Sequence, residues 1–581
     1  MEERVAGRVD QGPRRGGLRA VDHPGRLPPR PAGGAQRHLG DPTARRGRPV
    51  PRRPARPADG HLPGDLALPL RPAGTPHRAR RPGAALGPGP RPRARPGDIR
   101  QLRRSTGRNQ GRVDHPVTWA GSREPGAGSR EPGAGSREPG AGSREPVFGL
   151  SPEWLLDGDG KPIADALVLS HPGQVERLAA ACPEAAHTAV LGGDPCFDRI
   201  LAALPRRDAF RQAFGVRRGQ RLLVLNSTWN PTSLFGDGGP DDVLPLLLSR
   251  LPELPLDEYR VAVVLHPNVW HGHGPGQVRL WLDGARRAGV TLVDPVADWR
   301  QALVAADAVV GDFGSVSYYA AALGTPVLLA ATGPSVLDDG SQVAAFVRAA
   351  PKLDPYAALG PQLAELIAEG EVPPGPAELT TSCPGGSAGL LRSLCYRFLG
   401  LPEPAGPALL DPLPLPAHQP PAVTAPVRVL TRAGTGGADG TDGVVEVRRY
   451  AAARYEPEGA GDAHLVVHED TLDPGRLALA DVIVRHGGAD DPRLGPPSAW
   501  TERTLARHRS CTLAVQVTGP GSCTVRHRSG AVLELAGAFD GIDPAAAASA
   551  LLAAGPAPGV LTVRSGGTDH RVTVTQADPA G

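Results

Sequence analysis

Short apolar runs alternate with amphipathic stretches through the middle of the chain, and this alternation predicts an α/β fold. Buried-strand patterns occur at 165–170, 188–192, 221–226, 261–265, 291–293, 308–311 and 327–329. Helical patterns separate these runs, and strands that alternate with helices usually pair in parallel. Residues 216–400 are therefore predicted to form one doubly wound, Rossmann-like domain, and residues 147–215 the remnant of a preceding α/β domain with the segment that joins the two.

The pattern changes beyond residue 400. The Pro-rich sequence at 401–426 is typical of a linker. Short alternating runs predict strands at 427–430, 444–448, 465–467, 482–484, 512–518 and 523–527. Residues 561–575 predict a hairpin closed around Gly566 and Gly567. We therefore expect a small β-rich domain over 427–581.

Residues 1–146 lack the apolar positions that a folded core needs. Residues 1–112 contain 26 arginines, no lysine and eight acidic residues, and the first aromatic residue is Trp119. Such a segment cannot bury enough apolar surface to offset the entropy of ordering, so it is predicted to be a disordered Arg/Pro/Gly-rich region. Between Gly121 and Pro146 the unit Gly-Ser-Arg-Glu-Pro-Gly-Ala repeats every seven residues. It has no apolar a and d positions, which excludes a coiled coil.

An arginine-rich tail is typical of segments that bind nucleic acid or an anionic membrane, because guanidinium groups displace phosphate counterions. Lys161 and Lys352 are, however, the only lysines in the chain. This bias favours a GC-rich gene, and GC-rich DNA translated out of frame yields Arg, Pro, Gly and Ala. We expect residues 1–146 to be a start-site or frame artefact, with no specific nucleic-acid partner.

The sequence gives little support for a metal site or a membrane-spanning helix. The six cysteines form no Cys-x-x-Cys motif, and no apolar run reaches the roughly 18 residues of a membrane-spanning helix. His464 and His468 lie roughly 13 Å apart if both belong to one strand, which is too far to share an ion. We therefore expect solvated strand histidines, no metal site, no cofactor, free thiols and a cytoplasmic location.

Polar residues follow three of the predicted strands. The turn after residue 311 contains Asp312, and Gly314 and Ser315 open a helix there, so unpaired N–H groups and the positive end of the helix dipole favour a phosphate. The other two patches are 226–231, with Thr228 and Trp229, and 266–268, with His266 and Asn268. Each patch alone is more often a helix cap or turn. Together, at the carboxyl ends of parallel strands, they predict a ligand site.

At these positions the chain resembles the C-terminal nucleotide-binding domain of the CDP-glycerol glycerophosphotransferase family, over about residues 165–375. That family carries a Thr-Asp-Tyr-Ser-Ser-Val turn followed by Leu-Gly-Lys-Pro, together with Ala-Pro-Thr-Trp-Arg, Leu-His-Pro and Gly-Tyr-Pro-Arg-Asn-Asp motifs. The corresponding segments here are 311–316, 323–326, 226–230, 265–267 and 193–198. The resemblance implies a GT-B glycosyltransferase fold, of which 147–215 would be the remnant of the N-terminal domain.

The resemblance also implies a transferase that extends a teichoic-acid-type cell-wall or cell-surface polymer. The donor would be a CDP- or UDP-activated small molecule, and the acceptor a lipid-linked compound or polymer. Such an enzyme would associate peripherally with the inner face of the cell membrane.

The same resemblance assigns residues to the donor phosphates. Ser315 and the backbone from Gly314 to Val316 would hold the donor diphosphate. His266, with Asn268 beside it, would donate a hydrogen bond or positive charge to the same phosphates.

The remaining roles implied by the resemblance concern the nucleotide. Asp312 would orient the site or contact the ribose, and Thr228 and Trp229 would border the nucleotide pocket. The catalytic candidates are thus His266 and Asp312.

Several departures keep alternatives open. Asn230 stands where the family has a basic residue, Gly314 replaces a serine, and only 147–215 can belong to an N-terminal domain, which supplies the family's acceptor-side base. One alternative is a UDP-N-acetylglucosamine 2-epimerase-like enzyme, which shares a His-Pro after a strand, although the second glycine of that family's Ser-Asp-Ser-Gly-Gly turn is missing here. Another GT-B glycosyltransferase is a related alternative. The third is a nucleotide-binding scaffold without catalysis.

Overall fold

The computed structural model describes residues 149–236, 242–333, 337–418, 423–434, 443–451, 461–537 and 541–577. The disorder and repeats predicted for residues 1–146 lie outside these residues. Among the described residues, every helix is too short or too polar to cross a membrane.

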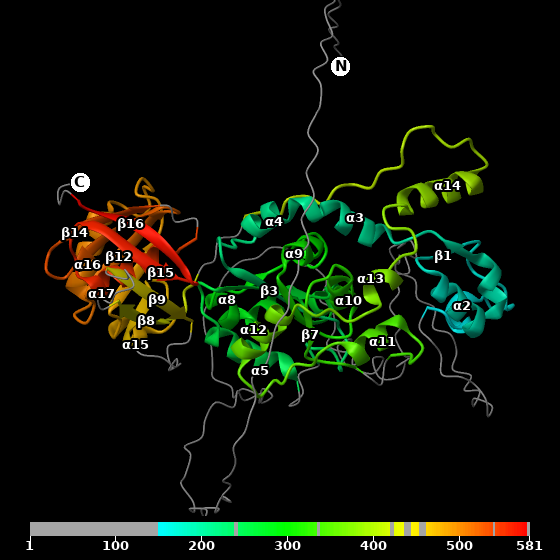
Figure 1. The fold of residues 1–581 in the computed structure, drawn as a ribbon, viewed down its shortest axis with the longest axis horizontal. Coiled ribbons are helices and arrows are strands. Elements are labelled where there is room, and N and C mark those ends of the chain that lie inside the picture. The colour runs from blue at the N-terminus through cyan, green and yellow to red at the C-terminus, as the bar shows by residue number, and fades with distance from the viewer. Residues whose placement is uncertain are drawn as a thin grey trace, which may run out of the picture. The chain divides into compact units, whose positions relative to one another are not determined.

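A five-stranded parallel sheet forms the centre of the predicted Rossmann-like domain, with the strand order β5-β4-β3-β6-β7. Figure 1 shows β3 and β7 of this sheet among the surrounding helices. The strands are β3 (Arg221–Ser227), β4 (Tyr259–Leu265), β5 (Thr291–Leu292), β6 (Ala308–Gly311) and β7 (Val327–Leu329). Their side chains are buried with few exceptions, because helices cover both faces. The prediction of a doubly wound parallel sheet is confirmed.

Alternate residues of each strand enter two separate cores. Leu222 and Val224 of β3 pack on one face, whereas Leu223 and Leu225 pack on the other. The first face is covered by α3 (Pro195–Ala203), α4 (Arg207–Ala213), α9 (Trp299–Ala305), α10 (Ser315–Ala322) and α11 (Gln342–Ala349). The second is covered by α5 (Val243–Arg250), α6 (Pro267–His273), α7 (Pro275–Trp281) and α12 (Leu359–Glu369).

The segment before β3 consists of two parts that pack in different places. Its first part forms a two-stranded parallel sheet of β1 (Leu167–Leu169) and β2 (Ala189–Leu191), with α1 (Pro152–Leu155) and α2 (Pro172–Ala181). Helices α3 and α4 instead pack into the core of the five-stranded sheet through Phe197, Ile200 and Phe210. The predicted boundary at 215/216 stays a prediction.

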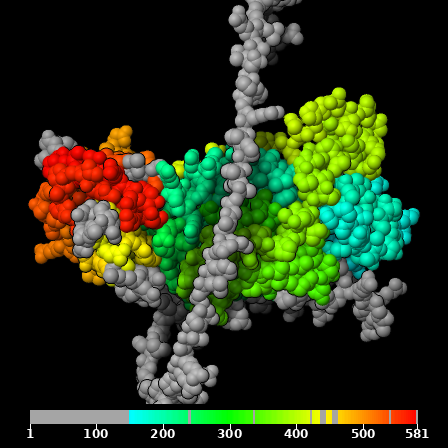
Figure 2. All heavy atoms as spheres, viewed as in Figure 1, coloured from blue at the N-terminus to red at the C-terminus, as the bar shows by residue number. Residues whose placement is uncertain are grey.

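The helices that follow the sheet return to this small α/β segment. They are α13 (Pro376–Leu379) and α14 (Ser387–Leu399). Asp198 on α3 accepts hydrogen bonds from the backbone N–H of Gly385, at 2.6 Å, and of Ser387, at 2.9 Å. In space-filling view the cyan atoms of the small sheet lie directly against the yellow-green atoms of this returning segment (Figure 2).

The Pro-rich segment contains no helix or strand in its described parts, but much of it is anchored. Arg199 Nε donates to the Asp411 carbonyl at 2.8 Å, and Gln301 Nε2 donates to the Pro414 carbonyl at 3.0 Å. Leu413 is 2% exposed and belongs to the core of the sheet. Because proline-rich backbone makes few hydrogen bonds of its own, its carbonyls are available to side-chain donors. The expected linker is therefore bound to the domain over this stretch.

Nine strands close into a barrel over residues 427–576. They are β8 (Val427–Ala433), β9 (Val444–Tyr450), β10 (Asp462–His468), β11 (Val482–His486), β12 (Leu513–Gly519), β13 (Ser522–His527), β14 (Val532–Gly537), β15 (Gly559–Ser565) and β16 (Thr568–Gln576). Every strand predicted from the sequence is present, and β14 is additional. Gly566 and Gly567 have positive φ in the β15–β16 turn, as the predicted hairpin requires.

Helices make this region more than the small β-rich domain expected. Strands β10, β11 and β12 are parallel, and α15 (Pro474–Ala478) and α16 (Pro497–Arg507) connect them. A third helix, α17 (Pro544–Ala554), has eight consecutive buried residues and contacts β8, β9, β12 and β15. It therefore fills the barrel as a helix that is apolar on all sides.

The barrel histidines are not the solvated residues that the sequence suggested. His464 is buried, and its Nε2 lies 3.0 Å from Ser549 Oγ on α17. Burial lowers the pKa of His464 to about 4. His468 stacks on His486 with ring centroids 5.3 Å apart. The described residues hold no cluster of His, Cys, Asp and Glu that could bind a metal ion.

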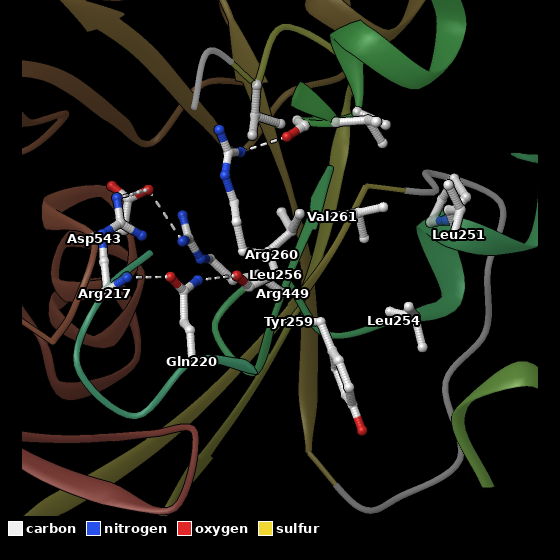
Figure 3. A pocket seen from close by; sticks show the side chains of 15 residues that line it. Arg217, Gln220, Leu251, Leu254, Leu256, Tyr259, Arg260, Val261, Arg449 and Asp543 are labelled. Carbon is white, nitrogen blue, oxygen red and sulfur yellow. Dashed lines mark hydrogen bonds and ion pairs between the residues drawn. The ribbon is translucent and has the colours of Figure 1, made fainter. Parts of the chain in front are cut away.

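A buried ion pair joins β9 to the turn before β4. Arg449 donates to both oxygens of Asp257, at 2.6 and 2.9 Å. It also lies 3.1 Å from Asp543, and Figure 3 shows these two side chains. The neighbouring cations Arg449 and Arg217 lower the pKa of Asp543 despite its burial. Removing one member of such a pair would leave an uncompensated buried charge.

We predict that His464→Gln reduces the pH dependence of unfolding. Unfolded histidine titrates near pH 6.5 and folded His464 near 4. The unfolded state therefore binds more protons between these values, and stability falls as the pH drops from about 6.5 towards 4. Between about pH 7 and pH 5 this group costs about 2 kcal/mol.

Urea unfolding followed by circular dichroism should show this loss in the wild type and about 2 kcal/mol less loss in the His464→Gln variant. The control His271→Gln, at an exposed position, should behave as the wild type. Equal losses in all three proteins would contradict the prediction.

Candidate functional site

A cavity of about 220 Å³ lies at the carboxyl ends of β3, β4 and β6. It brings together five of the predicted site residues: Thr228, His266, Gly314, Ser315 and Val316. The remaining lining residues are Asn226, Ser227, Val264, Leu265, Pro267, Pro295 and Trp299. The convergence follows from topology, since neighbouring parallel strands end at the same edge of a sheet.

The start of α10 forms one wall of the cavity. Gly314 is the N-cap residue and supplies no side-chain hydrogen bond to the first turn. A Cβ at this position would lie 2.4 Å from Thr228 Cγ2, so the close approach of the two turns requires glycine. This steric limit explains why a serine hydroxyl is not accommodated at residue 314. The uncapped N–H groups of the first turn therefore present a partial positive charge at the wall.

Asp312 stands behind this wall and does not line the cavity. Its side chain is 0% exposed. One carboxylate oxygen accepts hydrogen bonds from the Thr228 N–H at 2.8 Å and the Leu234 N–H at 3.0 Å, and the other accepts from the Gly314 N–H at 3.0 Å. Burial raises the pKa of Asp312, whereas these donors lower it. Direct contact with a ribose, one of the two roles expected for Asp312, does not fit this burial, whereas orienting the turns does.

His266 caps the helix that follows β4. Its Nδ1 accepts a hydrogen bond from the Asn268 N–H at 3.1 Å. In the neutral ring the proton therefore resides on Nε2, which makes that nitrogen a donor. Of the predicted neighbours, Asn268 is exposed and Trp229 is 53% exposed, and neither lines the cavity. The Trp229 ring lies 6.3 Å from the His266 ring, between centroids.

Asn226 begins the predicted patch 226–231 but was not among the predicted site residues. It is 1% exposed, and its Oδ1 accepts a hydrogen bond from Ser317 Oγ at 3.2 Å. Its Nδ2 has no hydrogen-bond partner among the described residues. Exchanging the amide atoms would leave the oxygen without a partner instead. A buried polar atom of this kind is costly unless a ligand or water satisfies it. The sequence feature that could have indicated this residue is an amide side chain at the end of an apolar strand.

Pro295 and Trp299 were not predicted as site residues either. Pro295 lies in the connection between β5 and α9, and Trp299 is the first residue of α9. The Trp299 ring stacks on Tyr319 of α10, with 6.1 Å between the ring centroids. The Tyr319 hydroxyl donates to Asp194 Oδ2 at 2.7 Å. This chain of contacts fixes the tryptophan against the helix. The cavity therefore combines polar donors on one side with proline and an indole on the other.

Comparisons with known proteins give matches among solved structures alone. No protein-family model matches the chain, and no curated protein matches it. A structure of the wall teichoic acid polymerase TagF aligns with 15% identity and a TM-score of 0.29, covering 41% of this chain and 58% of that one. The UDP-GlcNAc 2-epimerase from Neisseria meningitidis aligns with 15% identity and a TM-score of 0.25, covering 41% and 61%.

A glycosyltransferase from Rickettsia africae ESF-5 aligns with 10% identity and a TM-score of 0.25, covering 41% of this chain and 63% of that one. The chain thus spans less than two thirds of each of these structures. At such identities and scores, the likeness carries no argument about activity, substrate or partner.

We predict that Asp312→Ala destabilises the protein by about 3 kcal/mol, because several buried donors lose their acceptor. Urea unfolding measures the change. Asp339→Ala, at an exposed position on the same domain, is the matched control and should change stability by less than about 0.5 kcal/mol. Equal effects of the two substitutions would show that the Asp312 network does not hold the turns.

Proposed function

We propose that the cavity binds the diphosphate of a nucleotide-activated donor and that the protein is a GT-B-type transferase. The observation that carries the proposal is that several hydrogen-bond donors converge on the cavity, whereas no acidic side chain lines it among the described residues. The Asn226 amide, the first turn of α10 and the His266 ring meet at one cavity, and no carboxylate lines it among the described residues. A set of donors without acceptors suits an anion with several oxygens.

The proposed chemistry uses these donors where negative charge develops. As the bond to the leaving nucleotide breaks, its phosphate gains charge, which the α10 dipole and His266 Nε2 would stabilise. Ser315 and the backbone of Gly314 to Val316 would hold the diphosphate. Asp312 would act as a positioning residue, because it holds Thr228 and Gly314 in place. Pro295 and Trp299 would offer an apolar surface to the rest of the nucleotide.

Within this class we propose a CDP-glycerol-like donor, on the motif resemblance described above. The hydroxyl of a lipid-linked or polymer acceptor would attack the phosphorus that carries glycerol. The phosphorus bond to the nucleotide would break, CMP would leave, and the hydroxyl proton would pass to a base. The protein would work at the inner face of the cell membrane, where such acceptors are held.

A second candidate is a nucleotide-binding scaffold without turnover. The observation that favours it is the small size of the α/β segment before β3, which contains two strands among the described residues. A GT-B enzyme places its reaction between two Rossmann-like domains. The two candidates share the same cavity and differ in whether a donor is consumed.

We predict that His266→Ala weakens CDP binding about tenfold, the effect of losing roughly one hydrogen bond to a charged group. Asn226→Ala should weaken it several-fold, because its buried amide loses its role as donor. Isothermal titration with CDP and UDP measures both effects. The control His273→Ala changes an exposed histidine of the same helix and should bind as the wild type.

Measuring turnover of activated donors distinguishes the transferase from the epimerase-like alternative and from the scaffold. Release of CMP from CDP-glycerol or CDP-ribitol, lowered by His266→Ala, would support the transferase. Conversion of UDP-GlcNAc without nucleotide transfer would favour the epimerase-like alternative, and binding with no turnover of any donor the scaffold. Unchanged binding of both nucleotides in both cavity variants would contradict the proposed site.

A further inference from the structure

A second, larger cavity runs along the free edge of the five-stranded sheet. Its volume is about 810 Å³, and it follows the edge strand β5 and the residues on both sides of it. Helices α6 and α7 and the short helix α8 (Asp283–Arg287) provide the opposite wall. Pro295 lines both this cavity and the smaller one described above. The two sites are therefore neighbours, but their polar residues are entirely different.

The strongest indication of a ligand is the indole of Trp270. Its side chain lines the larger cavity and is 9% exposed. Its Nε1–H has no acceptor among the described residues. Arg279 lies over the same ring, 5.8 Å from its centroid. An indole N–H can only donate, so the atom that satisfies it must be an acceptor.

The charged side chains around the larger cavity are mostly positive. Arg279, Arg286 and Arg287 line it from α7 and α8. Arg287 is paired with Asp283 at 2.7 Å, whereas Arg286 is 3.9 Å from the same carboxylate, so Arg286 retains much of its capacity to bind an anion. Among the described lining residues Asp294 is the one acid, and its Oδ1 accepts the N–H groups of Val296 and Ala297 at 2.8 Å.

Arg260 adds a fixed positive charge to the floor. Its guanidinium donates to the carbonyls of Phe214 and Gly289 and to Thr291 Oγ1, and Figure 3 shows the side chain with one of these bonds. Burial lowers the pKa of Arg260 to about 10, so the group stays protonated at neutral pH. It cannot turn towards a ligand, but it raises the potential of the cavity.

We propose that this edge cavity binds a ligand with at least two phosphate groups, separately from the nucleotide. Trp270 and Arg279 would contact one phosphate, and Arg286 a second, because Arg279 and Arg286 come from successive helices. A single phosphate fills little of an 810 Å³ space, so an extended oligophosphate or phosphodiester fits better. The proposal does not depend on transfer chemistry in the smaller cavity.

The test uses linear tripolyphosphate and a local measurement. Residues 1–112 contain 26 arginines, and guanidinium groups attract anions in general, so total binding would not report on this cavity alone. Hydrogen exchange of peptides from 270–294 reports on this cavity, because no residue in that range lines the smaller one. In the full-length protein, tripolyphosphate should protect these peptides at a concentration at least about tenfold below that needed with inorganic phosphate.

Substitutions of the lining residues then test whether tripolyphosphate binds in the edge cavity. The double variant Arg279→Ala/Arg286→Ala should raise the midpoint concentration about tenfold or more, and Trp270→Phe, which keeps the ring but removes the N–H, several-fold. Arg348→Ala, at an exposed arginine on α11, is the matched control and should leave it unchanged. Exchange without ligand shows whether each variant keeps the folded sheet.

The outcomes are distinct from those of the nucleotide proposal. His266→Ala should leave tripolyphosphate protection of 270–294 unchanged, and Arg279→Ala/Arg286→Ala should leave CDP binding unchanged. An unchanged midpoint in the double variant would overturn the edge-cavity proposal. So would equal protection by inorganic phosphate, or a loss of protection in His266→Ala as large as in the double variant.

Discussion

The hydrogen-bonded carboxylate of Asp312 is the constraint on which the candidate site depends. It is fully buried, and it ties the turn after β3 to the turn after β6 through Thr228 and Gly314. A buried carboxylate is tolerated only when donors surround it, so both turns must keep one geometry. That geometry brings Gly314 against Thr228 and leaves the first turn of α10 facing the cavity. An acid that does not line the cavity thus shapes it.

Much of the sheet and part of the site follow from the sequence, for physical reasons. The strands are unbroken apolar runs because helices bury both faces, and parallel strands end together, so the sequence alone was enough to group Thr228, His266 and Ser315. Asp312 could be noticed but not assigned, because its role comes from its burial. Pro295 and Trp299 lie between β5 and the first turn of α9, and their position depends on β5 being the outer strand. Local periodicity does not determine the order of strands.

The C-terminal region shows what periodicity cannot predict. Its strands alternate clearly, yet neither the closure of the barrel nor the parallel run β10-β11-β12 follows from alternation. Helix α17 is rich in alanine and apolar on every side, so it carries no amphipathic period. His464 lies on a strand with the spacing of a solvated residue but bonds to Ser549 of that helix. Its environment exists only once the helix is in place.

Because α17 lies inside the barrel, the strands that are synthesised before it cannot complete their packing until it has emerged. The strands β8 to β14 leave the ribosome before this helix, and among the described residues of the barrel no other helix fills the inner face that they share. The barrel also needs β15 and β16, which follow α17 and join β14 to β9. Until Gln576 has emerged, the nascent chain therefore carries an open sheet with exposed edges, a state prone to association with other chains. The strand edges at β9 and β14 are therefore paired only near the end of synthesis.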